Sequence, residues 1–162
     1  MARNEPALRD HLSRALSWDS AHLTLEAAVK GLPARLRGKR PKGFTHSPWE
    51  LLEHLRLAQR DLLDFCRDPD YEEGDWPDAY WPKSPVPPSP RAWTASLKAL
   101  AADREDFKDF VATTPDLFAE IPGYPGKTIL RSVLLAIDHA SYHLGQLLMA
   151  KKQLVKAVTR SD

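Results

Sequence analysis

Apolar residues recur at helical spacing along four stretches of this chain, and this periodicity limits the fold more than any other feature. The clearest stretch is HSPWELLEHLRLAQRDLLDFC, residues 46–66. It has Ser47 as the helix N-cap, Pro48 at the first helical position and Glu50 three residues after the cap, which is the pattern of a capping box. The apolar face of this predicted helix is formed by Leu51, Leu55, Ala58, Leu62 and Phe65.

The same periodicity predicts three further helical segments. The first covers about residues 5–32, with a break at SWDS and Ser20 as the cap of its second piece. Another covers about residues 89–112 and begins with Ser89 as its cap. The last covers about residues 128–154. Four main helices, one long crossover and short links elsewhere favour an all-α fold, a four-helix bundle.

Two connections carry strong turn signals. Residues 67–88, RDPDYEEGDWPDAYWPKSPVPP, contain six prolines, which exclude a regular helix or strand ladder there. A connection of this length is a crossover, a functional loop or a disordered segment, and its aromatic residues argue against disorder. The second connection, DLFAEIPGYPGKT at residues 116–128, has the proline and glycine punctuation of a small β-hairpin before the last helix.

Length and charge place the chain among ordinary globular proteins. With 162 residues it is expected to form one domain, 1–162, with its own core. A net charge of +1 provides no field that draws a protein to nucleic acid or anionic lipid, so neither partner is expected. The single cysteine, Cys66, excludes an internal disulfide framework. No apolar run could span a bilayer and no apolar signal core is seen, so we expect a cytoplasmic protein.

The segment DHASYHLGQL, residues 138–147, places His139 and His143 four residues apart within the last predicted helix. On a helical wheel both histidines lie away from the main predicted core stripe, which is formed by Leu130, Val133, Leu134, Ile137, Ser141, Leu144 and Leu148. Their neighbours on that second face are small or polar and uncharged: Ser132, Ala136, Gln146 and Ala150. Such a face is typical of a pocket or a buried site rather than of a solvated helix surface.

Four-residue spacing allows both imidazoles to reach one metal ion from the same side of a helix. Ala140 follows His139 where the H-E-x-x-H zinc motif has its glutamate base, so a metalloprotease of that type is not expected. His54 supplies a third imidazole from the edge of the capped helix, and bundles commonly build metal sites from facing helices. The alternative is that each histidine only forms hydrogen bonds, without a metal.

SPWELLEHLRLAQRDLLDF followed by DHASYHLGQL resembles the DinB-like (DinB/YfiT) superfamily of bacterial metalloenzymes, over about residues 7–154. Three further segments, AHLTLEAAVKGLP, PDYEEGDWPDAYWP and IPGYPGKTILR, are similar to the subgroup with a longer Trp- and Pro-rich loop. The resemblance implies a bundle of up-down-down-up topology that is frequently a homodimer. It also implies a divalent ion, such as zinc or nickel, held by His54, His139 and His143. Some members are transferases that attach mycothiol, bacillithiol or glutathione to a substrate.

Three neutral imidazoles leave at least one coordination position open, as in catalytic sites. An ion with an open position activates either water for hydrolysis or a thiol for S-transfer. We therefore expect a metal-dependent low-molecular-weight-thiol S-transferase or a hydrolase that acts on a small molecule. The alternative is a non-catalytic, metal-binding, stress-associated bundle protein.

Two groups of residues are candidates to support this site. Asp61, one heptad after His54, and Gln146, three residues after His143, could fix imidazole tautomers through the second ring nitrogen, although a solvated position explains each equally well. A hydrophobic lid over the substrate pocket has four candidates, for which core packing is the alternative: Trp49, Trp76, Tyr80 and Trp81.

Overall fold

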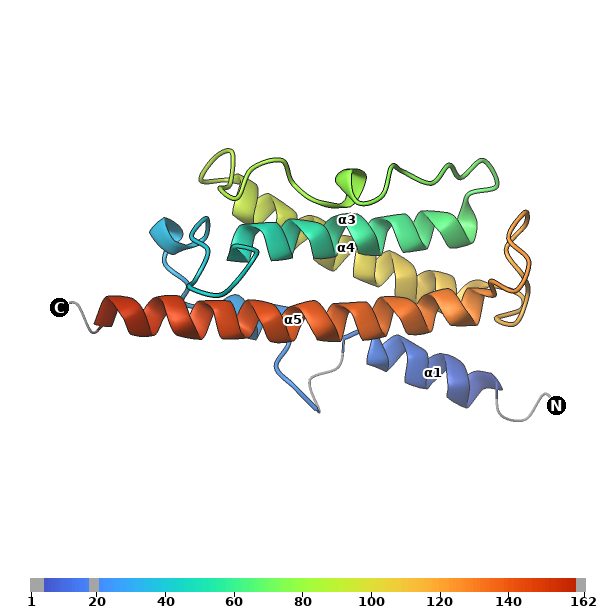
Figure 1. Cartoon of the computed structure of the whole chain (residues 1–162). Helices are drawn as coiled ribbons and strands as arrows, with labels where there is room; N and C mark the ends of the chain where they lie inside the picture. Colours follow the sequence, from blue (N-terminus) through green and yellow to red (C-terminus); the bar gives the residue numbers. More distant parts are fainter. Residues whose placement is uncertain (1–4, 18–20, 160–162) are drawn as a thin grey trace.

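The computed structural model describes residues 5–17 and 21–159, and helices make up its architecture (Figure 1). The five α-helices are α1 (Glu5–Ala15), α2 (Leu25–Val29), α3 (Pro48–Arg67), α4 (Ala92–Thr113) and α5 (Ile129–Thr159). Two short 3₁₀ helices, η1 (Ala34–Leu36) and η2 (Asp78–Tyr80), lie in the connections. The predicted all-α class is confirmed.

Helix α3 packs against both α4 and α5. Helix α1 packs against α4 and α5, and the short α2 packs against α5. In Figure 1 the chain follows α3 and α4 in one direction and α5 in the opposite direction. The segment 68–91 returns along the bundle between the end of α3 and the start of α4, so it runs beside α3 for most of its length.

The start of α3 is fixed by the predicted capping box. The Ser47 hydroxyl accepts a hydrogen bond from the Glu50 backbone N–H at 3.2 Å, and the Glu50 carboxylate accepts one from the Ser47 N–H at 2.7 Å. The Arg40 guanidinium also binds the Glu50 carboxylate, and the Trp49 N–H donates to the Arg37 carbonyl at 2.8 Å. These bonds fix the register of α3, and with it the direction in which His54 points.

Several predicted boundaries differ from the structure. Helix α4 begins at Ala92 rather than near Ser89. In the turn before the helix, the Ala92 N–H donates to both the hydroxyl and the carbonyl oxygen of Ser89. The predicted cap Ser20 lies outside the described residues, and Thr24 caps α2 through a bond from the Ala27 N–H. Helix α5 continues beyond the predicted end near residue 154, to Thr159.

The predicted β-hairpin is not confirmed, since the described residues contain no β-strand. A single antiparallel bridge joins Glu120 to Thr128. Between these positions the backbone makes consecutive tight turns, in which the Tyr124 N–H donates to the Ile121 carbonyl and the Lys127 N–H donates to the Tyr124 carbonyl. Pro122 and Pro125 have no N–H to extend a ladder, so pairing stops at one bridge.

The core divides into two clusters along the bundle. One is built around α2, the first half of α3 and the second half of α5, and includes Leu52, Leu147 and Ala150. The other is built around α1, the end of α3, the end of α4 and the start of α5, and includes Leu63, Phe107 and Val133. The histidine segment of α5 lies between the residues that α5 contributes to the two clusters.

One predicted core position of α5 is wrong, because Leu134 is 51% exposed. The buried face of α5 is rotated toward the histidine side, where the buried residues include Ser132, Ala136, Leu147 and Ala150. Helix α3 packs against α5, and of the small and polar residues predicted to line a buried site, Ser132, Ala136 and Ala150 are buried, whereas Gln146 is half-buried. In the part of the chain that the structure describes, no helix combines the length and apolarity that crossing a bilayer requires.

Candidate metal centre

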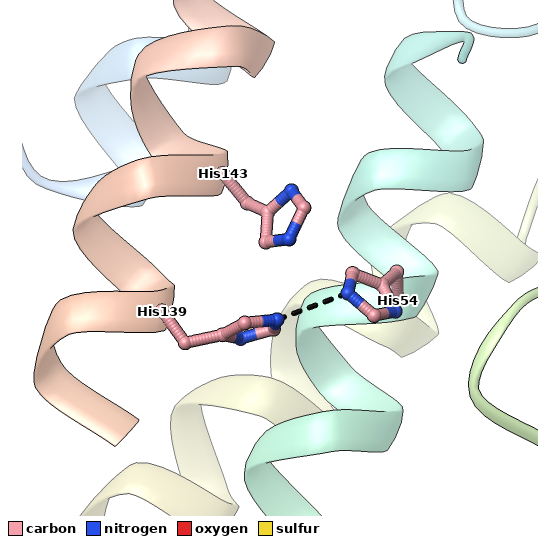
Figure 2. A group of neighbouring side chains, drawn as sticks. All are labelled: His54, His139 and His143. Atoms are coloured by element: carbon pink, nitrogen blue, oxygen red, sulfur yellow. Dashed lines mark hydrogen bonds between the residues drawn. The ribbon is translucent and has the colours of Figure 1, made fainter. Parts of the chain in front are cut away.

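His54 from α3 and His139 and His143 from α5 converge on one point between the two helices (Figure 2). One ring nitrogen of each imidazole lies within 4.8 Å of the corresponding nitrogens of the other two. Nε2 of His54 lies 3.0 Å from Nε2 of His139. His54 and His143 are buried, with 2% and 7% of their surfaces exposed, and His139 is half-buried. The structure therefore brings together the three histidines singled out from the sequence.

The second ring nitrogens of two histidines have hydrogen-bond partners that set their tautomers. Nδ1 of His54 lies 2.7 Å from the Tyr80 carbonyl oxygen, which can only accept, so Nδ1 carries the proton. Nδ1 of His143 lies 2.9 Å from the Gln146 amide oxygen and carries the proton for the same reason. Both neutral rings therefore present an unprotonated Nε2 to the cluster. This arrangement is the one that supports metal-ligating histidines.

His139 differs from the other two histidines. Because Nε2 of His54 has no proton, the 3.0 Å contact between the two Nε2 atoms requires a proton on Nε2 of His139. His139 must adopt the tautomer with its proton on Nδ1 before this nitrogen can bind an ion. His139 is also the most exposed of the three rings and lines a cavity beside the cluster.

The ring of Trp81 fixes the plane of the His54 imidazole. The two rings stack at a centroid distance of 3.8 Å and an interplanar angle of 2°. The opposite face of Trp81 stacks on His46 at 4.0 Å and 16°. His54 is thus held by the Tyr80 carbonyl at its edge and by Trp81 at its face, so the 3₁₀ turn η2 and the residue after it orient this imidazole.

Electrostatics keep the cluster neutral at physiological pH. Burial, with added repulsion from His54 and His143, lowers the pKa of His139 to about 4. Burial and the charge of His54 lower the pKa of His143 to about 4, although the Gln146 hydrogen bond acts in the opposite direction. Burial also lowers the pKa of His54. Unprotonated imidazoles are the form that binds metals, so proton competition is weak at pH 7.

These residues fit a divalent transition metal ion. Two tetrahedral imidazole nitrogens on zinc are about 3.3 Å apart, close to the 3.0 Å between the Nε2 atoms of His54 and His139. Nitrogen donors suit zinc, nickel and copper, and do not suit magnesium or calcium, which prefer oxygen. No fourth His, Cys, Asp or Glu joins the group within residues 5–17 and 21–159. The set therefore corresponds to the open, three-ligand type of site.

A cavity of about 300 Å³ adjoins the cluster, with His54 and His139 in its wall. Its other walls come from α3, the crossover and the start of α5, and are lined by Ala58, Asp61, Leu62, Phe65, Tyr71, Glu73, Trp76, Tyr80, Lys127, Arg131 and Leu135. The Tyr71 and Tyr80 hydroxyls both donate to Oδ1 of Asp61, at 2.8 and 3.0 Å. Burial raises the pKa of Asp61, and these two hydrogen bonds partly oppose that effect.

The candidate supporting residues have different positions. Gln146 accepts the hydrogen bond of His143 Nδ1, which is the tautomer-fixing role predicted for it from the sequence. Asp61 bonds two tyrosine hydroxyls in the cavity, and the Tyr80 carbonyl instead holds the second nitrogen of His54. Sequence reasoning missed this backbone contact, because a carbonyl has no sequence signature.

The four residues predicted to form a lid lie in three different places. Trp76, 71% exposed, and Tyr80 line the cavity. Trp81 lies on the His54 ring. Trp49 is 4% exposed, belongs to the core cluster around α2 and is absent from the cavity wall, because the capped start of α3 turns it inward. Core packing, the alternative reading, therefore accounts for Trp49.

The cavity residues that were not anticipated from the sequence include Tyr71, Lys127 and Arg131. Arg131, Leu135 and His139 are spaced four residues apart and share one face of α5, so a helical wheel centred on His139 could have found Arg131. Lys127 precedes the helix, and its position depends on the turns before α5, which carry no comparable signal.

Comparison with known proteins gives one result. The family model of the DinB superfamily matches residues 18–147, which include all three histidines and most of the chain. Searches of curated proteins and of solved structures found no match. The family match and the three-histidine cluster are together consistent with a metal-dependent enzyme. The chain belongs to the DinB superfamily.

Proposed function

We propose that this protein is a divalent-metal-dependent enzyme that transfers a low-molecular-weight thiol to a small-molecule substrate, with hydrolysis as the alternative reaction of the same site. His54, His139 and His143 would hold the ion, zinc or nickel. The observation that carries the proposal is the convergence of the three imidazoles at a cavity wall, without a fourth side-chain ligand among the described residues. A structural ion is normally closed by four protein ligands and does not need an adjoining cavity.

A bound ion of this kind supplies Lewis acidity that lowers the pKa of a thiol or of a water molecule at an open position. The residues of the chain supply the rest. Gln146 and the Tyr80 carbonyl keep the protons of two imidazoles on Nδ1. Trp81 shields one face of His54, which limits the access of water.

Asp61 is the proposed acceptor of the proton that the thiol releases. Its carboxylate lies in the wall of the same cavity, and burial raises its pKa above the ordinary value. Both tyrosine hydroxyls donate to Oδ1, so Oδ2 has no partner among the described residues. After proton transfer, the sulfur would form a bond to an electrophilic carbon, whose leaving group departs with its bonding electrons.

A homodimer is part of the proposal. Support comes from α5, where Leu135, Tyr142 and Met149 are spaced by seven residues and are 39%, 63% and 56% exposed. An exposed apolar stripe at this spacing is typical of a helix that packs on another helix.

The experiment is a conjugation assay in which bacillithiol, mycothiol or glutathione reacts with a chromogenic aryl halide. We expect turnover by the metal-reconstituted protein, loss of turnover after chelation, and loss in a His143→Ala variant. His22→Ala is the matched control, because His22 is exposed and outside the cluster. Turnover that is insensitive both to chelation and to His143→Ala would eliminate the proposed mechanism. Stoichiometric metal with neither conjugation nor hydrolysis would favour the non-catalytic metal-binding alternative.

A further inference from the structure

The cavity beside the histidines has two chemically different ends. The inner end is formed by His54 and His139, and the other end carries the cations of Lys127 and Arg131. Between them the wall includes the apolar side chains of Ala58, Leu62, Phe65 and Leu135. A ligand that fills this space therefore meets a metal-binding cluster, an apolar section and a positive rim in turn.

The two cations have no anionic partner within the molecule. Neither Lys127 nor Arg131 forms an ion pair with a carboxylate in the described ranges, although Glu73 lines the same cavity. Other arginines of the helices are paired, such as Arg56 with Glu53 and Arg60 with Asp64. The Lys127 ammonium is instead held over aromatic rings, 5.0 Å from the centroid of Tyr124 and 5.5 Å from that of Phe65. This position fixes the ammonium at the rim without neutralising its charge.

The backbone at the start of α5 does not compete for an anion. The first N–H groups of the helix are satisfied: Ile129 donates to the Ala119 carbonyl, Leu130 to the Leu117 carbonyl and Arg131 to the Thr128 hydroxyl. An anionic group in the cavity would therefore be bound by the side chains of Lys127 and Arg131. The positive end of the helix dipole adds to their field.

We propose that the Lys127 and Arg131 rim of this cavity binds a carboxylate of the substrate or co-substrate, so that the site takes molecules with a reactive head at the histidines, an apolar middle and an anionic tail. The inference rests on the proposed function for what happens at the histidine end. Arg131 and His139 are eight residues apart on α5, which separates their Cα atoms by about 12 Å along the helix axis. A short aliphatic chain, together with the length of the arginine side chain, spans this distance.

The test uses matched ligands that differ only in the tail group. Cobalt-loaded protein is titrated with mercaptohexanoate or with mercaptohexanol, and the thiolate-to-cobalt absorption band gives the two dissociation constants. We expect the carboxylate to bind about tenfold more tightly, which is the effect of one charge-assisted hydrogen bond. The Lys127→Met/Arg131→Met double variant should lose this preference. Mercaptoacetate, too short to reach the rim, should bind both proteins equally.

The control is Lys152→Met, which removes one positive charge from an exposed position of α5 outside the cavity. It should keep the full preference for the carboxylate. Arg131→Met alone provides a second variant, because Arg131 is exposed and lies outside both core clusters, so its loss leaves the fold intact. It should lower the preference in part.

A second measurement needs no metal. Calorimetric titration of the metal-free protein compares hexanoate with hexanol, and we expect only hexanoate to lose affinity in the double variant. Equal affinity for the two ligands in the wild type, or a preference that the double variant retains, overturns the anionic-tail proposal. Absence of a cobalt–thiolate band with any of the thiols, together with a normal calorimetric preference, would instead refute the proposed function and leave the anion site standing.

Discussion

Replacing Gln146 with methionine removes the amide oxygen that accepts the Nδ1–H hydrogen bond of His143. The substitution keeps the length of the side chain and leaves both ligand-bearing helices otherwise unchanged. Without this acceptor, the His143 ring can place its proton on either nitrogen and can rotate. Only one of the resulting states presents an unprotonated Nε2 to His54 and His139, so the variant must pay an ordering cost when it binds an ion.

The magnitude follows from the kind of bond that is lost. The loss of an outer hydrogen-bond partner of a ligating histidine lowers metal affinity by about 10–100-fold. The donor and acceptor are both neutral here, and a neutral hydrogen bond contributes about 1 kcal/mol. Gln146 is also only half-buried. We therefore expect a loss of about tenfold, at the lower end of the range. Gln146→Glu should have the opposite sign, because a carboxylate is a stronger acceptor for the imidazole N–H.

The assay is a competition titration in which zinc partitions between the protein and a chromogenic chelator. Gln153→Met is the matched control, since Gln153 lies on the same helix and donates to the Lys42 carbonyl, away from the histidines. If Gln146→Met binds zinc as tightly as this control, the hydrogen bond does not support the site and the tautomer argument is refuted. Tighter binding by Gln146→Met than by Gln146→Glu would refute it as well.

Three further outcomes follow from the same structure. Trp81→Leu removes the ring stacked on His54, so zinc affinity in the same competition assay should fall while circular dichroism stays native; unchanged affinity would show that the stack does not orient the ligand. The metal-free protein should lose stability as the pH falls from about 6.5, the ordinary histidine pKa, toward about 4, because the unfolded chain binds protons in this interval that His139 and His143 in the folded protein exclude. Urea midpoints measured across this interval test the point, and a His139→Gln/His143→Gln variant should show a shallower pH dependence; equal slopes would contradict the shifts. Phe107→Ala opens a cavity in the core cluster that also includes Leu63 and Val133, and should lower the free energy of unfolding by about 3–5 kcal/mol while the folded fraction keeps its zinc affinity; a parallel loss of affinity would contradict the separation of core and site.

Features that depend on neighbouring residues were predictable from the sequence. The capping box at Ser47 and Glu50 and the four-residue spacing of His139 and His143 act within one helix, so pattern alone reveals them. The helical wheel predicts Leu134 in the core, yet Leu134 is exposed, because the wheel does not say which of two apolar faces the neighbouring helices will cover.

The crossover could not be predicted in the same way. Its prolines remove the helical or strand periodicity from which the orientation of a side chain could be inferred. Tertiary contacts therefore set its path. The roles of the Tyr80 carbonyl and of Trp81 at His54 therefore appear only in the structure. The same holds for Lys127, whose place at the cavity rim follows from the turns between Ile121 and the start of α5.

The most direct test is elemental analysis of untagged protein after reconstitution with zinc or nickel, made side by side with His54→Ala and His22→Ala. The three-histidine site predicts a stoichiometric ion in the wild type and in His22→Ala, and its loss in His54→Ala, because removal of the α3 ligand leaves only the pair on α5. Wild-type protein without stoichiometric metal, or His54→Ala protein that retains it, would contradict the metal centre.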